Sequence, residues 1–316
     1  MRAARRTGPL LATLWLCVLS SLGYSTAARA QGEGPRAYEL QPAGSRALNV
    51  YGMFGRGNTS FDPGAVVPGT AEVYENGSII EYSHGFALAG NAGSLLVSLP
   101  VGNVRRSVSV GGVVQSDASS GIGDLQITGA FGLLGSPALE EKDYEAYRPH
   151  LALSALTRVY VPTGAYDRTS AVNVGQNRWA LQLGVSSAYY LGDSFLDSSL
   201  TSFELIPSVI WYGDNNEPTS GNHSSQAPLT QLEGHVTRNL NQSFWLSLDA
   251  LFISGGETTT NGVSDQNRQR SLALGATASV ALADTVSVSL SYTDVVSKDS
   301  SGLRGHVIRL IAEFSL

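Results

Sequence analysis

Residues 306–316 read H-V-I-R-L-I-A-E-F-S-L and are the last of the 316 in the chain. Apolar side chains stand at every second position from Ile308 onward, and Arg309 and Glu313 stand in the opposite register. Ile311 is the exception to this alternation. A period of two places the two sets on opposite faces of one β-strand. Ending on a strand with one apolar and one polar face is typical of an outer-membrane β-barrel.

The first thirty residues have the features of a secretory signal peptide, for which we expect cleavage after Ala30. Three arginines among the first six residues precede an apolar run over 10–22, and small residues stand at 28 and 30. The apolar run is shorter than the roughly 20 residues of a membrane-spanning helix. Cys17 lies within this run and is the only cysteine. The mature chain therefore has no disulfide, thiol nucleophile or cysteine metal ligand.

The charge balance argues against a nucleic-acid partner. The chain has 20 basic and 26 acidic residues, a net charge of −6 that becomes −10 without the four arginines of the first thirty residues. Its only lysines are Lys142 and Lys298, so the sequence offers no basic patch. Mean hydropathy is close to zero, which fits either a soluble β-protein or a barrel whose strands are apolar on one face only.

Alternating stretches recur along the chain and predict about twelve antiparallel strands. The clearest stretches lie at 125–133, 179–185, 244–252, 272–282 and 286–292. The predicted strands are about 10 to 13 residues long, whereas globular strands average roughly 5 to 6 and membrane-spanning strands 9 to 11. Their second faces carry mainly Ser, Thr, Gly and Ala. We therefore predict an all-β transmembrane barrel over 47–316, preceded by a periplasmic leader at 31–46.

The predicted connections alternate in length, as they do in outer-membrane barrels, where the short side is periplasmic. Short turns are expected at 90–92, 241–242 and 282–284, whereas 135–149 and 191–201 are longer and the first of these contains one helical turn. Long polar outer loops are expected at 56–77, 103–121, 161–176, 214–227 and 255–270.

Six stretches carry more than a pattern. They read S-G-I-G-D-L-Q at 120–126, V-P-T-G-A-Y-D at 161–167, N-V-G-Q-N-R-W-A-L-Q-L-G-V-S at 173–186, Q-A-P-L-T-Q at 226–231, W-L-S-L-D-A at 245–250 and G-G-E-T-T-T-N-G-V at 255–263. Together they resemble a family of bacterial outer-membrane proteins labelled for a meta-pathway of phenol degradation. The resemblance implies a barrel related to transporters of hydrophobic compounds. The chain departs from such barrels in ending on Leu316 instead of Phe, which leaves Phe314 with Leu316 as the assembly signal.

Three motifs invite a catalytic or ligand-binding interpretation. Gly121–Asp124 has the glycines of a phosphate loop but lacks the following helix and Lys-Ser/Thr pair, so a strand-entry turn is favoured. His223 and Ser224 lie in a long polar loop, which favours a solvated loop over a catalytic dyad. The acidic stretch 214–217 lacks the ligand spacing of a tight calcium site. The sequence therefore predicts neither an enzyme nor a metal or other cofactor.

Charged residues on the predicted inner faces are the candidate functional residues. A charge that faces lipid costs about 2–4 kcal/mol at the midplane for Arg or Lys, so these side chains should face the lumen. Two interpretations remain open, a structural ion-pair network and a polar lining that selects what passes. Arg178 is the first candidate, and Glu233 with His235 is a candidate gate. The lumen-lining candidates are Glu81, Asp124, Arg158, Arg178, Glu204, Glu233, His235, Asp249, Arg309 and Glu313.

These features predict an outer-membrane channel or binding barrel for passive passage of small hydrophobic or aromatic compounds. The alternative is a structural or adhesive barrel with a closed lumen. The expected partners are outer-membrane lipid, the barrel-assembly machinery and a small hydrophobic or aromatic ligand.

Overall fold

A computed structural model describes residues 32–58, 72–110, 113–144, 146–219 and 221–316. The predicted signal peptide lies outside the described residues. Among those residues no helix has the length and apolar character needed to cross a bilayer.

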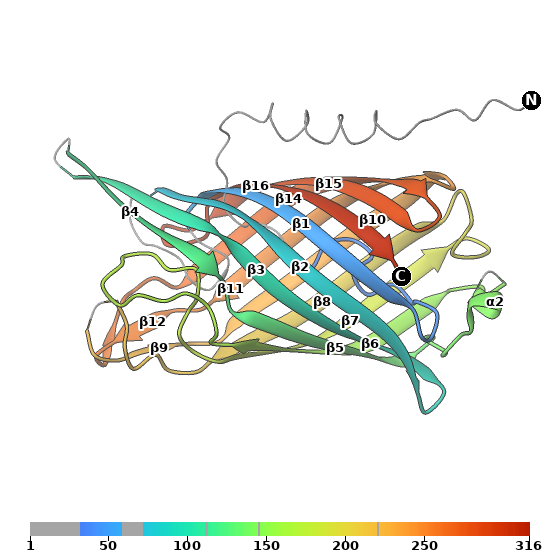
Figure 1. The fold of residues 1–316 in the computed structure, drawn as a ribbon, viewed down its shortest axis with the longest axis horizontal. Coiled ribbons are helices and arrows are strands. Elements are labelled where there is room, and N and C mark those ends of the chain that lie inside the picture. The colour runs from blue at the N-terminus through green and yellow to red at the C-terminus, as the bar shows by residue number, and fades with distance from the viewer. Residues whose placement is uncertain (1–31, 59–71, 111–112, 145, 220) are drawn as a thin grey trace, which may run out of the picture.

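The fold is a closed antiparallel barrel of twelve strands (Figure 1). Each strand pairs with its neighbours in the chain, and β1 pairs with β16 to join the two ends of the sheet. The wall strands are β1 (Arg46–Gly57), β2 (Glu72–Leu88), β3 (Asn91–Val110), β4 (Val113–Ile122), β5 (Leu125–Leu134), β6 (Leu151–Val161), β7 (Ala180–Leu191), β8 (Thr201–Tyr212), β10 (Leu229–Asn241), β11 (Phe244–Gly255), β14 (Gln269–Ala283), β15 (Val286–Lys298) and β16 (Gly305–Ser315).

Strands β4 and β5 count as one strand of the barrel because both pair antiparallel with β3. Gly123 and Asp124 interrupt them, and the ladder resumes on either side. The Gly123 amide donates to the carbonyl of Pro100 at 2.8 Å, which keeps the wall joined at the break. The G-I-G-D motif is therefore the end of β4 and a two-residue break within the wall, whereas the sequence predicted a strand-entry turn.

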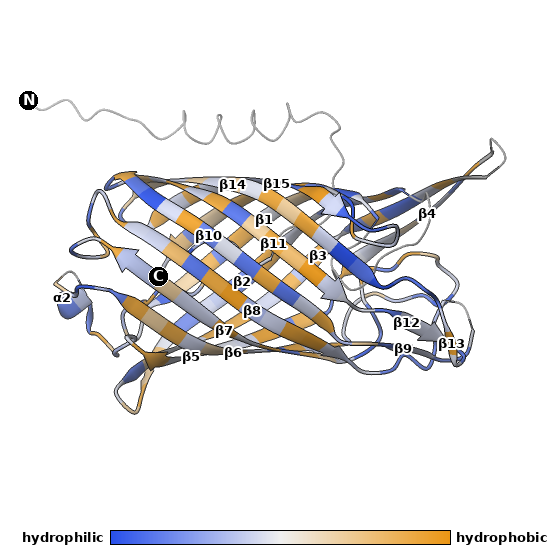
Figure 2. Ribbon diagram, turned by 180° about the vertical axis from the view of Figure 1, so that it is seen from behind, coloured by the Kyte–Doolittle hydropathy of each residue, from blue (hydrophilic) through white to orange (hydrophobic). Residues whose placement is uncertain are grey.

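Hydrophobic and hydrophilic residues alternate along the wall strands (Figure 2). In β8, Phe203, Leu205 and Trp211 are exposed on the outside, whereas Glu204 and Ser208 are buried on the inside. This alternation follows from the two environments that the strand separates. Outward-facing side chains contact lipid and are apolar, whereas inward-facing side chains contact the polar lumen.

The outer loops differ from the prediction at one place. Residues 103–121, expected to be a loop, are largely the paired ends of β3 and β4. This hairpin projects past the rest of the wall (Figure 1). Polar residues occupy both of its faces there, so the sequence alternation that marks a membrane strand is lost. A smaller sheet of β9 (Ser224–Gln226), β12 (Thr258–Thr260) and β13 (Val263–Ser264) lies in two other loops at the same end.

The opposite, periplasmic end has shorter connections, with one helical turn, α2 (Glu141–Tyr144). Between β5 and β8 the turns and strand ends form an apolar cluster. Phe195 is buried there and stacks on Tyr144 at 4.9 Å between ring centroids, and Leu40 from the N-terminal segment packs into the same cluster. The N-terminal segment is thereby anchored at the periplasmic mouth.

Candidate functional site: the lumen and the segment inside it

Residues 32–40, here called the lumen segment, lie inside the barrel in contact with its inner wall. The backbone amides of Glu33 and Gly34 each donate to the carboxylate of Glu233 on β10 at 2.7 Å. The amide of Arg36 donates to Glu204 on β8 at 2.9 Å. The sequence placed these residues in a periplasmic leader, and that position is wrong for the lumen segment. The physical reason is that wall carboxylates satisfy its otherwise unpaired amides.

An ion pair fixes the lumen segment to β6. Arg158 donates from both terminal nitrogens to the two carboxylate oxygens of Glu33, at 2.8 and 2.6 Å. Its Nε donates to Thr128 Oγ1 on β5 at 2.6 Å. Both side chains of the pair are about 14% exposed, so water screens the pair weakly. A bidentate pair in such surroundings is among the stronger polar contacts available to a protein.

Arg36 and Arg309 hold the lumen segment on the opposite side of the lumen. The guanidinium of Arg36 donates to Asn239 at 2.6 Å and lies 4.9 Å from the ring centroid of Trp245 on β11. Arg309 on β16 donates to the Gly32 carbonyl at 3.4 Å and lies 5.8 Å from the ring of Tyr51. The lumen segment therefore contacts β6, β8, β10, β11 and β16.

His235 lies between two carboxylates at the level of these contacts. Its Nε2 is 2.8 Å from Glu233 and its Nδ1 is 2.7 Å from Asp249. An imidazole with a carboxylate at each nitrogen satisfies both only when both nitrogens carry protons. Asp249 also accepts from Thr277 at 2.7 Å, which extends the network onto β14. Within this network, the carboxylate of Glu233 is the negatively charged group that accepts hydrogen bonds from the amides of the lumen segment.

Glu81 forms a separate cluster near the periplasmic end. Its carboxylate accepts from Ser98 at 2.6 Å and from Tyr51 at 2.9 Å, while Asn49 donates at 3.2 Å. Glu313 is in the same inner register and pairs across the sheet with Asn49. These contacts are typical of a polar network that stiffens the wall.

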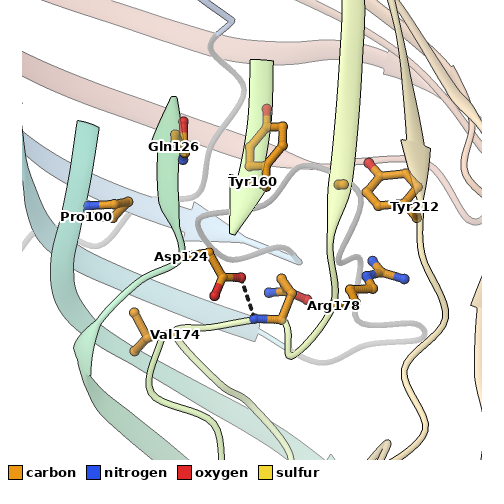
Figure 3. A pocket seen from close by; sticks show the side chains of 9 residues that line it. Pro100, Asp124, Gln126, Tyr160, Val174, Arg178 and Tyr212 are labelled. Atoms are coloured by element: carbon orange, nitrogen blue, oxygen red, sulfur yellow. Dashed lines mark hydrogen bonds between the residues drawn. The ribbon is translucent and has the colours of Figure 1, made fainter. Parts of the chain in front are cut away.

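At the outer end, Asp124 holds the loop between β6 and β7 over the lumen. Its two carboxylate oxygens accept from the amides of Gly164 at 2.9 Å and Gln176 at 2.8 Å. Arg178 ends the loop, bonds to Gln226 and stacks 4.5 Å from the ring of Tyr212. Figure 3 shows Asp124, Arg178 and Tyr212 round one recess. The break in the wall at Asp124 therefore positions the outer loop.

Two recesses lie beside the lumen segment and the outer loop. The outer recess, between Tyr160 and Tyr212, spans about 430 Å³ including open solvent, and the inner recess, beside Gly34 and His235, spans about 260 Å³ on the same measure. Polar side chains contribute to the lining of both, among them Asp124 and Arg178 in the outer recess and Glu233 and Asp249 in the inner one.

All ten candidate residues have a place at the lumen, although they do not form one site. Eight of them are inward-facing residues of wall strands, and Asp124 and Arg178 flank the outer loop. Glu204, Glu233, His235 and Asp249 come together with the lumen segment, as do Arg158 and Arg309. Glu81 bonds instead to Tyr51 and Ser98 of the wall, and Glu313 acts electrostatically on Glu39 near the end of the lumen segment. Whether these residues select what passes stays a prediction.

The motifs in the outer loops have structural partners. His223 Nε2 lies 3.1 Å from Asp214, with both side chains about half exposed. Ser224 belongs to β9 and pairs with Thr260. Among the described residues no cluster of three metal-ligating side chains occurs.

Comparison with known proteins identifies the family. Residues 54–301 match the family described as "Putative MetA-pathway of phenol degradation". The chain belongs to this family. No curated protein matches the sequence.

Among solved structures, the COG4313 outer membrane channel from Pseudomonas putida F1 is similar over 90% of this chain and 99% of its own, with 21% identity and a TM-score of 0.73. The β domain of the Bordetella autotransporter BrkA covers 87% of this chain and 100% of its own, at 11% identity and a TM-score of 0.47. The translocator domain of NalP from Neisseria meningitidis covers 87% and 90%, at 12% identity and 0.46. The first likeness shows that this family member has the fold of an outer-membrane channel barrel.

Sequence reasoning missed the lumen segment itself, including Glu33 and Arg36. A usable signal was present in Q-G-E-G-P-R-A-Y-E-L at 31–40, where charges of opposite sign stand three residues apart. Such charges in a short irregular stretch need partners, and the inner rows of the predicted barrel carried charges without assigned partners. Pairing the two sets predicts a filled lumen.

Proposed function

We propose that this protein is a channel for the passive passage of small hydrophobic and aromatic compounds, and that the lumen segment leaves its seat before passage. The observation that carries the proposal is a lumen filled by a segment that is not part of the wall. The wall strands complete their hydrogen-bond ladders with one another, so the barrel does not need the lumen segment to close. The family description, which refers to phenol degradation, supports the aromatic part of the proposal.

The contacts between the lumen segment and the inner wall are of a kind that can break and re-form, as a removable closure requires. Its contacts are mostly hydrogen bonds in which one partner is charged, each of which contributes about 1.5–3 kcal/mol net, and water can replace the lost partner of every one. In contrast, an apolar plug would have to expose its buried surface on leaving. The polar inner rows favour exchange of the lumen segment for water.

Export and assembly belong to the same proposal. The mature chain would begin at Gln31, after cleavage at Ala30, so that the lumen segment becomes the mature N-terminus. Phe314 and Leu316, at the end of β16, would meet the barrel-assembly machinery in the periplasm, and the outward apolar rows would meet outer-membrane lipid.

Uptake into proteoliposomes tests the transport step. The mature protein should accelerate phenol entry over that into empty vesicles. A variant in which Glu33 and Arg36 are each replaced by Gln should accelerate it further, because the lumen segment loses its charged contacts with Arg158 and Asn239. The matched control replaces the exposed Glu140 and Arg148 of the periplasmic turn in the same way and should match the wild type. Phenol entry at the rate of empty vesicles for all three proteins would remove the channel proposal.

A second candidate, a structural or adhesive barrel, is favoured by one observation, namely that the lumen segment lies inside the barrel and bonds to its wall. Single-channel conductance of the refolded mature chain separates the two functions. Discrete openings in planar bilayers support the channel. A silent bilayer, with both wild type and the charge-neutral variant inserted, supports the closed barrel.

A further inference from the structure

We propose that Arg158 and the apolar wall beside it form a binding site for an aromatic carboxylate, and that the lumen segment occupies this site as a built-in substitute for the ligand. The inference rests on the proposed function, because the ligand would replace the lumen segment on its way through the barrel. It adds to that function the chemical class of the compound and the residues that receive it.

The charged half of the site is the guanidinium of Arg158. Glu33 presents a carboxylate to it in the two-point geometry that any organic carboxylate adopts with arginine. Thr128 fixes the Nε edge from the wall, which leaves the terminal nitrogens facing the lumen. Among the described residues, the partners of those terminal nitrogens are Glu33 and Tyr38, and both belong to the lumen segment.

The apolar half of the site lies beside Arg158. Ala130, Leu156 and Ile206 are buried on the inner wall and pack together, although most inner positions of this barrel are polar. The aromatic ring of Tyr38 packs against this cluster. Its hydroxyl lies 3.4 Å from the Arg158 guanidinium, so ring and carboxylate reach the wall side by side. Tyr38 and Glu33 together thus present the two parts of an aromatic carboxylate.

Departure of the lumen segment leaves an unpaired, poorly solvated cation beside an uncovered apolar surface. Either exposure is unfavourable by itself, and one molecule that carries a ring and a carboxylate removes both. A neutral aromatic molecule covers the apolar surface only, and acetate pairs with the cation only. The site therefore favours the combination over either part.

Binding of 4-fluorobenzoate to the full mature protein in detergent micelles, followed by fluorine NMR, tests the assignment. The Glu33→Gln variant weakens the competing contact of the lumen segment, and its Kd for 4-fluorobenzoate should be at least tenfold lower than that of the wild type. Arg158→Gln should raise the Kd at least tenfold relative to the wild type. Arg158→Lys should do the same, because lysine keeps the charge but lacks the planar guanidinium that binds both carboxylate oxygens. 4-Fluorobenzyl alcohol, the neutral analogue, should bind at least tenfold more weakly to Glu33→Gln.

Leu156→Gln separates the apolar half from the charged half. It should weaken 4-fluorobenzoate binding severalfold and leave trifluoroacetate binding unchanged. The heat-dependent shift of folded barrels on gels checks that each variant is folded. Equal Kd values for Glu33→Gln and Arg158→Gln in folded protein would overturn the proposal. The result is independent of transport, since binding without vesicle uptake removes the channel and keeps the site, and uptake without this binding does the reverse.

Discussion

Glu39 is a buried carboxylate at the periplasmic mouth, where the lumen segment ends. Its pKa is raised from 4.5 to about 7, chiefly by burial and to a smaller extent by the charges of Glu204 and Glu313. Arg36 opposes this shift, but its Nε lies 3.7 Å from Glu39 Oε2, beyond hydrogen-bonding distance. The seated lumen segment therefore favours a protonated Glu39, whereas a released segment exposes it to water.

The pH dependence of release follows from that raised pKa. Protonated Glu39 stabilises the seated form fully below pH 4.5, and this stabilisation is lost between pH 4.5 and 7, in total about 3 kcal/mol. We therefore expect the open probability in planar bilayers to rise between pH 4.5 and 7 and then to level off. Glu39→Gln should abolish most of this rise, and the exposed Glu141→Gln should keep it. A rise that is unchanged in Glu39→Gln would assign the effect to another group.

At the scale of elements, the loop between β6 and β7 depends on the carboxylate of Asp124. Asp124→Asn replaces one of the two accepting oxygens by an NH2 group, which donates hydrogen bonds and cannot accept one from the backbone N–H that faces it. An unsatisfied buried donor costs about 1–3 kcal/mol, enough to loosen the loop without unfolding the wall. Hydrogen exchange at the amides of Gly164 and Gln176 should become at least fivefold faster. Asp284→Asn, at an exposed periplasmic turn, is the control and should leave both amides unchanged.

The elements also show where sequence is informative. Strands such as β8 and β16 were predictable because their residues face lipid and lumen in turn. Apolar and polar residues therefore alternate in the sequence of these strands. The upper part of β3 and β4 was not, since water meets both faces there. The break at Gly123 and Asp124 was predictable as a turn, but its role in holding a loop 40 residues away along the chain was not.

For the candidate site, what the sequence can predict is limited for a different reason. The direction of Arg158 and Glu233 follows from the cost of placing charge in lipid, so a single strand suffices to predict it. Their partners lie in the lumen segment, about 125 and 200 residues away in sequence. Such pairs exist only once the barrel is closed. The alternating charges of the lumen segment indicate that it needs charged partners, but they do not specify which wall residues these are.

For the molecule as a whole, the central expectation is that opening requires the lumen segment to move while the wall stays intact. A reversible covalent lock tests this. A Cβ at Gly32 would lie 2.4 Å from Cδ of Glu233, so side chains at positions 32 and 233 face each other. We expect the pair Gly32→Cys and Glu233→Cys to form a disulfide on oxidation. Cys17 is the only cysteine of the sequence, so a protein produced from Gln31 onward would contain no other disulfide.

The oxidised double variant should show few or no openings, because the lumen segment is tied to β10. Reduction should restore conductance to at least the wild-type level, since Glu233 no longer accepts the amides of the lumen segment. Each single cysteine variant controls for the loss of a wall or segment residue and should not respond to reductant. Equal conductance before and after reduction, with the disulfide verified by mass spectrometry, would mean that ions pass beside a seated lumen segment, and the closure assigned to it would then be wrong.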